Sequence, residues 1–152
     1  MWICAEAKVI EKLVLIKQNT DLQCNTLTQM QIAEFVRTND LDAHIAHLIH
    51  TYRIRRDAAI SAIENYFPKT IQYTQPEGGL FIWVELPEKI NATDLLQKSL
   101  KRHVAFVSGE SFYAEQPKYN TMRLNFSCMD EEKINAGFKI LGELIMEELK
   151  NE

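Results

Sequence analysis

The side chain best suited to chemistry in this sequence is the guanidinium of Arg123. It lies in residues 120–126, where apolar residues alternate with Arg123 and Asn125. This alternation predicts a strand with one apolar face beneath helices and with Arg123 on the opposite face. A guanidinium binds a carboxylate through two parallel hydrogen bonds, and a strand holds it more rigidly than a loop does. Spacing alone favours an exposed cross-strand ion pair for Arg123, and the binding of a carboxylate over a cleft is the alternative.

A second segment, residues 74–87, predicts the strand beside it. Pro76 and the pair Gly78-Gly79 break the backbone before a run of alternating apolar side chains. The two glycines either bring the backbone close to a ligand or form a bulge where the strand begins. A bulge alone is enough to explain the pair. Aromatic residues in a small sheet usually fill its core, so we expect this of Phe81 and Trp83.

Other residues with reactive or metal-binding side chains predict no site. His44, His47 and His50 recur every third residue, so on a helix they drift around the axis and cannot converge on one ion. Cys128 follows a strand with no histidine near it in sequence, so no Cys-His pair is supported. We expect no metal site and no catalytic residue within the chain.

Composition limits the classes of partner. The chain has 152 residues, a formal charge of −4, and 46% hydrophobic and 25% charged residues, as ordinary globular proteins do. A net negative charge argues against nucleic acid, and no apolar run is long enough to span a bilayer. Three cysteines without C-x-x-C spacing (Cys4, Cys24 and Cys128) indicate reduced thiols and a cytoplasmic location.

The periodicity of apolar residues predicts the elements that hold these segments. Helices are expected at residues 6–18, at 26–38 with Thr26 and Gln29 as a capping box, and at 41–67 before Pro68. After these helices we expect strands at 71–74 and within residues 74–87, and then a helix that Asn91 opens. Strands at 104–107 and 120–126 follow, and Ser127 or Asp130 caps a last helix. This order predicts an α+β fold, a small antiparallel-rich sheet with helices layered on one face.

Three motifs together carry a resemblance to a known family. They are P-x-G-G-x-F-x-W-x-x-L-P at residues 76–87, V-A-F-V-S-G-x-x-F at 104–112, and N-T-M-R-L-N-F-S at 120–127 with an E-E-K-I helix after it. This combination resembles the C-terminal part of class I and II aminotransferases, which are fold type I pyridoxal-phosphate enzymes, and most closely the branch that acts on 2-aminoadipate and aromatic amino acids. It implies amino transfer between an amino acid and a 2-oxo acid, pyridoxal 5'-phosphate as cofactor, and a homodimer.

The resemblance also implies roles for particular residues. Arg123 would bind the α-carboxylate of the substrate. Asn25 and Thr26, in N-T-L-T-Q, would lie near the cofactor phosphate of the neighbouring subunit, although an ordinary helix start explains these residue types equally well. Trp2-Ile3 matches the segment that follows the family's cofactor-binding lysine, which would precede residue 1. We therefore expect this chain alone to be inactive and not to bind the cofactor covalently.

The domain assignment follows from the same resemblance. Residues 1–40 would be a remnant of the end of the large pyridoxal-phosphate domain, residues 41–67 the connecting helix, and residues 68–152 the C-terminal small domain. Two alternatives remain open: the sensor domain of a winged-helix transcriptional regulator, and a free-standing α+β binding module. The module predicts that residues 1–38 pack into one core, whereas a fragment of an enzyme would expose apolar surface there.

Overall fold

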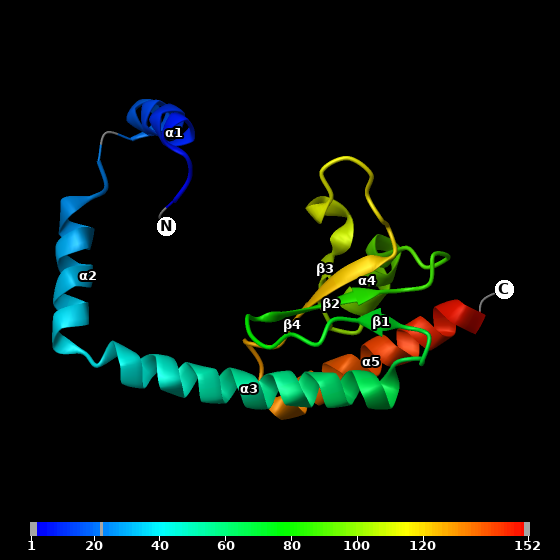
Figure 1. Ribbon diagram of the computed structural model, residues 1–152. Coiled ribbons are helices and arrows are strands. Elements are labelled where there is room, and N and C mark those ends of the chain that lie inside the picture. Colours follow the sequence, from blue (N-terminus) through cyan, green and yellow to red (C-terminus); the bar gives the residue numbers. More distant parts are fainter. Residues whose placement is uncertain (1–2, 22, 151–152) are drawn as a thin grey trace. The chain divides into compact units, whose positions relative to one another are not determined.

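A computed structural model describes residues 3–21 and 23–150 of the chain (Figure 1). The chain divides into two compact units, the first ending at Ile45 and the second beginning at Ala46. The match of Trp2 to the family's segment lies outside the described residues. None of the helices in the described ranges is both long enough and apolar enough to cross a membrane.

The first unit holds the helices α1 (Ala7–Thr20) and α2 (Thr26–Thr38), as expected. The cap of α2 differs from the expected one. Asn25, one residue before Thr26, accepts a hydrogen bond from the backbone N–H of Thr28 at 3.0 Å. Gln29 does not reach back to complete a capping box with Thr26, and its amide instead donates to the carbonyl oxygen of Cys24 at 3.2 Å.

Neither α1 nor α2 contains a buried residue. Most of their large apolar side chains are about half exposed or more, whereas Ile10 and Leu13 of α1 are partly covered. The most exposed of these are Ile16, Leu27, Met30, Ile32 and Phe35. The two helices therefore present an extensive apolar surface.

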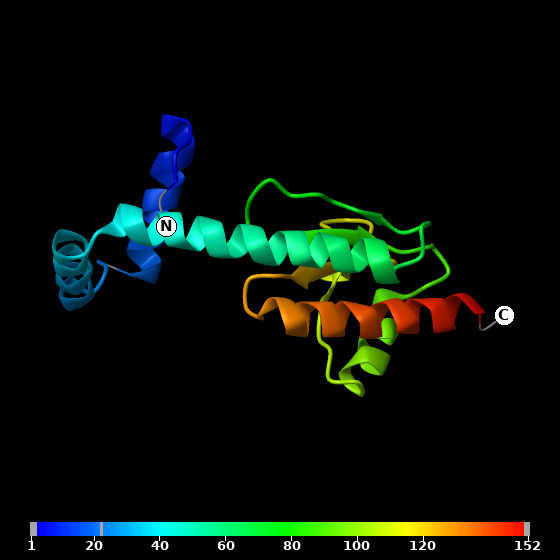
Figure 2. The same ribbon diagram turned by 90° about the horizontal axis from the view of Figure 1, so that it is seen from below.

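The helix α3 (Leu41–Tyr66) begins after Asp40, whose carboxylate accepts from the backbone N–H of Ala43 at 2.9 Å, and it ends before Pro68. Its apolar stripe runs along its whole length, but its buried residues are Ala59, Ala62 and Ile63. Burial is confined to its last two turns because these lie beside α5 (Glu131–Lys150), as Figures 1 and 2 show.

The second unit contains a four-stranded sheet in the order β1-β2-β4-β3, in which all neighbours are antiparallel. The strands are β1 (Gln72–Tyr73), β2 (Phe81–Glu85), β3 (Val107–Ser108) and β4 (Thr121–Asn125). This arrangement confirms the predicted α+β class. The strand expected at 104–107 is shorter and later, because the backbone N–H of Val104 still bonds to Ser99 at the end of α4 (Ala92–Leu100).

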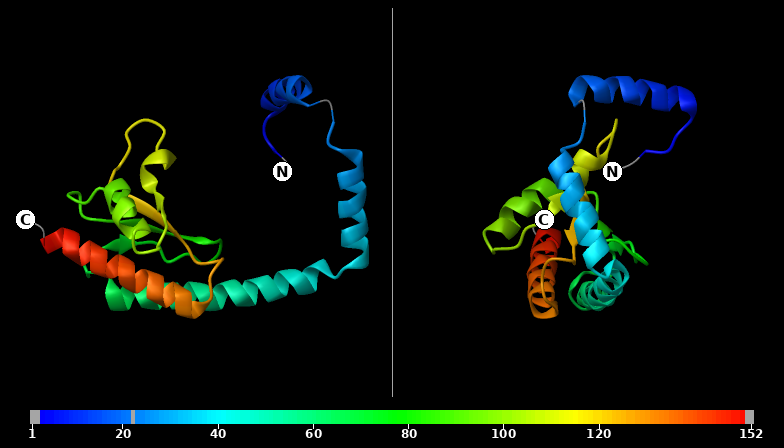
Figure 3. Two further views of the ribbon diagram at one scale, coloured as in Figure 1. Left: turned by 180° about the vertical axis from the view of Figure 1, so that it is seen from behind. Right: turned by 90° about the vertical axis from the view of Figure 1, so that its left-hand side faces the viewer.

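One face of the sheet forms the core of the second unit. Ile82 and Val84 of β2 and Met122 and Leu124 of β4 are at most 3% exposed, and α3, α4 and α5 contribute apolar residues to the same cluster. The helices lie along this face in the views of Figure 3. The rings of Phe67 and Phe138 stack with centroids 6.1 Å apart and join the end of α3 to α5.

Side-chain caps fix where the last two helices begin. Asn91 accepts from the backbone N–H groups of Thr93 and Asp94, as expected. Of the two residues expected to cap α5, Asp130 does so, because its carboxylate accepts from the N–H of Lys133 at 2.9 Å. Ser127 instead donates its own N–H to the side chain of Asn125.

Candidate functional site

Arg123 lies in the middle of β4, on the face of the sheet that the helices leave uncovered. It stands opposite Trp83 of β2 on one side and Val107 of β3 on the other. Its neighbours in sequence, Met122 and Leu124, point into the core. The alternation in the sequence therefore predicted the face of Arg123 correctly.

Two phenylalanine rings lie against the guanidinium of Arg123. Its Cζ is 4.0 Å from the ring centroid of Phe81 and 4.6 Å from that of Phe112. A cation at this distance from a ring face is attracted by the ring's quadrupole. The two rings come from separate segments, because Phe81 begins β2 and Phe112 ends η1 (Gly109–Phe112), a single turn of 3₁₀-helix.

The expectation that Phe81 and Trp83 fill the core is wrong. Phe81 is 39% exposed, and Trp83 is half-buried on the same open face. Both occupy odd-numbered positions of β2, and the helices cover only the face formed by Ile82 and Val84. Trp83 instead packs edge-on against Phe112, with centroids 5.6 Å apart and an interplanar angle of 83°.

The charge of Arg123 has no partner among the residues that the structure describes. Within residues 3–21 and 23–150, no carboxylate lies within ion-pair distance of it, and its Nε is buried without a hydrogen-bond partner. The nearby carboxylate of Glu85, which lies two residues along β2 from Trp83, is paired with Lys118 at 2.9 Å. Arg123 is therefore available to an anion from outside the described residues.

Gly109 sets the position of η1 against the sheet. Gly109 does not have a positive φ, since the only glycine with positive φ among the described residues is Gly79, at 79°. Gly109 is needed for space, because a Cβ there would lie 2.8 Å from the Cβ of Thr121 and would collide with its hydroxyl. This close approach places η1, and with it Phe112, against β4.

The glycine pair at the entry of β2 plays a different role from that of Gly109. A Cβ at Gly78 or Gly79 would meet no atom within 4 Å, so neither glycine is required for close packing. Gly79 is required for its left-handed backbone, which turns the chain into β2. A hollow of about 280 Å³ lies between this turn and α3, lined in part by Tyr52 and Arg56.

The other residues singled out in the sequence lie elsewhere. Asn25 and Thr26 belong to the first unit, where the side chain of Asn25 is engaged as a helix cap. The three cysteines of the chain are free and exposed. Across the described ranges, no group of three or more His, Cys, Asp or Glu residues could hold a metal ion.

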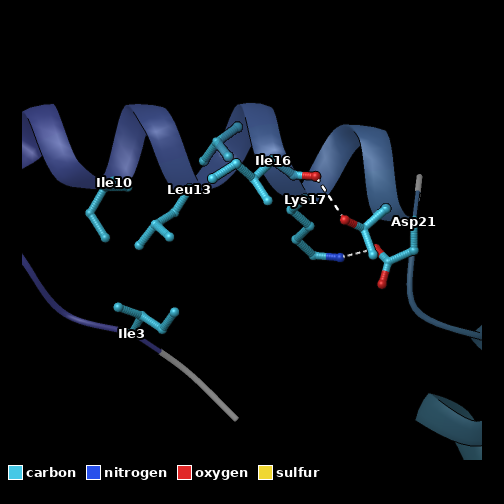
Figure 4. A pocket seen from close by; sticks show the side chains of 8 residues that line it. Ile3, Ile10, Leu13, Ile16, Lys17 and Asp21 are labelled. Carbon is cyan, nitrogen blue, oxygen red and sulfur yellow. Dashed lines mark hydrogen bonds and ion pairs between the residues drawn. The ribbon is translucent and has the colours of Figure 1, made fainter. Parts of the chain in front are cut away.

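A hollow of about 420 Å³ in the first unit carries little chemistry. Ile3, Ile10, Leu13 and Ile16 line most of it (Figure 4). Its charged residues, Lys17 and Asp21, are paired with each other, and this hydrogen bond raises the pKa of Lys17. Because its walls are apolar and its two charged side chains pair with each other, this hollow suits the packing of an apolar side chain better than catalysis.

Comparison with known proteins gives consistent matches. Residues 2–141 match the model of the family described as aminotransferase class I and II. An aromatic-amino-acid aminotransferase of Thermococcus litoralis is 45% identical over 149 residues, which are 98% of this chain and 36% of that protein. A 2-aminoadipate transaminase of Thermus thermophilus is 35% identical over 138 residues, which are 91% of this chain and 34% of that protein.

Solved structures agree with these matches. The crystal structure of a kynurenine aminotransferase from Pyrococcus horikoshii, in complex with PMP, is 44% identical with a TM-score of 0.85, and the match covers 95% of this chain and 36% of that one. A transcriptional regulator of the HTH type from Bacillus subtilis is also similar, with 30% identity over 146 residues. The chain spans about a third of the length of the proteins that it matches.

Proposed function

Because this chain belongs to the class I and II aminotransferase family, we propose that it supplies the carboxylate-binding side of an active site that transfers an amino group between an amino acid and a 2-oxo acid. One observation carries the proposal: the guanidinium of Arg123 stands on the open face of the sheet without a carboxylate of its own among the described residues. A cation held in this way has its strongest available partner in the carboxylate of a ligand.

The contribution of Arg123 is to orient the substrate. Two parallel hydrogen bonds from its Nη atoms would fix the position of the α-carboxylate. The position of the carboxylate in turn sets the direction in which the Cα–H bond of the substrate points. Because β4 is paired on both sides, by β2 and β3, the backbone under Arg123 is held firmly. Pyridoxal 5'-phosphate, when bound, supplies the electron sink that makes removal of the Cα proton feasible.

The described residues suit binding of the substrate better than covalent attachment of the cofactor. A lysine that binds the cofactor covalently needs a dry environment that lowers its pKa. Lys8, Lys12 and Lys17 are all exposed, and the hydrogen bond from Lys17 to Asp21 raises the pKa of Lys17. We propose that the covalent attachment is made by a residue outside this sequence and that the 152 residues alone are inactive.

The domain assignment is part of the proposal. We propose that residues 1–40 belong to the end of a large cofactor-binding domain, that residues 41–67 connect the domains, and that residues 68–152 form the small domain. Two observations support this: the boundary between the two compact units, which falls between Ile45 and Ala46 inside α3, and the exposed apolar surface of α1 and α2.

The same surface supports a homodimer, and we propose that α1 and α2 contribute to its interface. The proposed role of Asn25 and Thr26 is to place the N-terminus of α2 near the cofactor phosphate of the neighbouring subunit. The unpaired backbone N–H groups at a helix N-terminus favour anions. We also propose a cytoplasmic location, which the three free cysteines support.

The two alternative functions receive less support. A free-standing binding module predicts that residues 1–38 pack into one core, but α1 and α2 contain no buried residue. A regulator's sensor domain fits the 30% identity to a transcriptional regulator, but the aminotransferases that match are 45% and 35% identical.

The experiment compares substrates with and without a carboxylate in the protein that carries this chain. Arg123→Lys should lower kcat/KM for an amino acid by about 100-fold, because the bidentate geometry is lost, and should leave the rate with the corresponding decarboxylated amine nearly unchanged. Arg102→Lys is the control, because Arg102 pairs with Glu147 on the helical side of the second unit. Equal loss with both substrates would contradict the proposed role of Arg123.

A further inference from the structure

We infer that Phe81 and Phe112 are positioning residues, which hold the guanidinium of Arg123 in the orientation that a carboxylate must meet. The inference rests on the proposed function of Arg123 and adds to it how the side chain is kept in place. It starts from the two ring contacts, at 4.0 Å and 4.6 Å from Cζ.

The need for such residues follows from what Arg123 lacks. An arginine side chain has several rotatable bonds, and hydrogen bonds to a carboxylate or a carbonyl usually fix its end. Here the Nε is buried and has no hydrogen-bond partner, and no ion pair orients the Nη atoms within the described residues. We therefore expect the two phenylalanine rings to fix the guanidinium.

The rings also help to compensate for taking a charge partly out of water. Arg123 is half-buried, so part of its hydration is lost before any ligand binds. Attraction to the ring faces returns some of this energy without occupying the hydrogen-bonding edge of the guanidinium. A carboxylate of the chain would compensate for more of the lost hydration energy, but it would occupy the edge of the guanidinium that the ligand needs.

Each ring is itself held by the fold. Phe81 stands on β2, which pairs with β4 through five residues, Phe81 to Glu85. Phe112 is fixed by its edge contact with Trp83 and by the packing of Gly109 against Thr121 at the start of η1. Both phenylalanines are more than a third exposed, so neither is fixed by burial in the core.

The experiment observes the side-chain Nε–H of Arg123 by NMR in the protein that carries this chain, with the resonance assigned through Arg123→Lys. Protons over a ring face are shifted by the ring current, so the resonance should be displaced from the usual arginine position. Phe81→Leu and Phe112→Leu should each move it back, and Phe81→Tyr and Phe112→Tyr should retain the displacement. Phe35→Leu is the control, because Phe35 lies on α2 and is similarly exposed.

The binding part of the experiment titrates pyruvate while the same resonance is followed. Each leucine variant should bind pyruvate about threefold to thirtyfold more weakly, as expected for one lost cation–ring contact, and each tyrosine variant should bind within about twofold of the unchanged chain. The backbone amide resonances of β4 show whether a leucine variant still folds. If a leucine variant does not fold, the pyruvate affinities of the tyrosine variants are compared with that of the unchanged chain.

The outcomes separate this inference from the proposed function. A displaced resonance that depends on the rings, without any response to pyruvate, supports the positioning role and contradicts carboxylate binding by Arg123. A response to pyruvate that is the same in the leucine variants and the unchanged chain supports carboxylate binding and overturns the positioning role. An Nε–H resonance at the usual arginine position in the unchanged chain also overturns it.

Discussion

Gly142 of α5 lies directly against the backbone carbonyl group of Tyr66 at the end of α3. A Cβ built on Gly142 would be 2.9 Å from the carbonyl carbon of Tyr66 and 3.0 Å from its Cβ, and would collide with the carbonyl oxygen. The two helices can approach this closely only because residue 142 has no side chain. The contact brings the buried end of α3 against the middle of α5.

Gly142→Ala should therefore destabilise the second unit by about 1–3 kcal/mol, since the helices must separate to admit the methyl group. Gly137→Ala is the matched control. It lies in the same helix, and its added Cβ would meet only Val104, at 4.0 Å. This change should raise the free energy of unfolding by about 0.5–1 kcal/mol, because alanine loses less conformational freedom than glycine. Urea unfolding at constant m-value measures both, and equal effects of the two substitutions would show that the close contact is unimportant.

Gly109→Ala should displace η1, because the added methyl group would meet the side chain of Thr121. Phe112 would then move away from Arg123, so the variant should bind pyruvate more weakly, by about as much as Phe112→Leu does. Gly78→Ala is the control, since its Cβ would meet nothing within 4 Å and its φ is not positive. Titration of both variants measures the effect, and full affinity in Gly109→Ala would disprove this role for Gly109.

Asp130 makes α5 sensitive to acid. Its carboxylate accepts hydrogen bonds from the side chain of Lys133 and from the backbone N–H of the same residue, and these lower the pKa of Asp130 below the ordinary aspartate value. The pKa is depressed in the folded state, so its stabilising effect is present above the ordinary pKa and is lost as the pH falls through the folded one.

An NMR titration of the Asp130 carboxyl group should show this depressed pKa, and Lys133→Ala should move it back toward the ordinary value. The backbone hydrogen bond remains in the variant, so the return should be partial. An unchanged Asp130 pKa in Lys133→Ala would mean that the side chain of Lys133 does not form this bond in solution.

Asn91→Ala should lower the free energy of unfolding of the second unit by about 1 kcal/mol, because α4 loses the acceptor for two of its first N–H groups. Asn25→Ala removes the corresponding cap of α2 in the first unit. It should leave the urea midpoint of the second unit unchanged, as followed by the backbone amide resonances of β4. A matching loss in both variants would show that the two units unfold together.

The sequence predicted the elements and the face of Arg123 well, because these depend on local periodicity and capping. Asn91 and Asp130 cap the helices that they were expected to cap, and the apolar residues of β4 point to the core. The places of Phe81 and Trp83 were predicted wrongly, because both faces of β2 are apolar and alternation cannot tell which one the helices will cover.

The contact between Phe112 and Arg123 could not be predicted from the sequence. It depends on a turn of 3₁₀-helix whose position is set by the fit of Gly109 against Thr121, twelve residues further along the chain. The motif at residues 104–112 contains this glycine, but nothing in the sequence shows that it lies against Thr121. On this sheet the resemblance to the family pointed to Arg123, and the structure adds the two rings beside it.

The central pairing of the sheet joins β2 to β4, strands separated by about forty residues of sequence, and the same two strands carry both the buried core residues and the Arg123 site. Contacts this distant in the chain form slowly, because a large loop must close before they are gained. Arg123 and Phe81 should therefore meet only when the whole sheet assembles, and the amide protons of β2 and β4 should exchange with deuterium only through unfolding of the entire second unit.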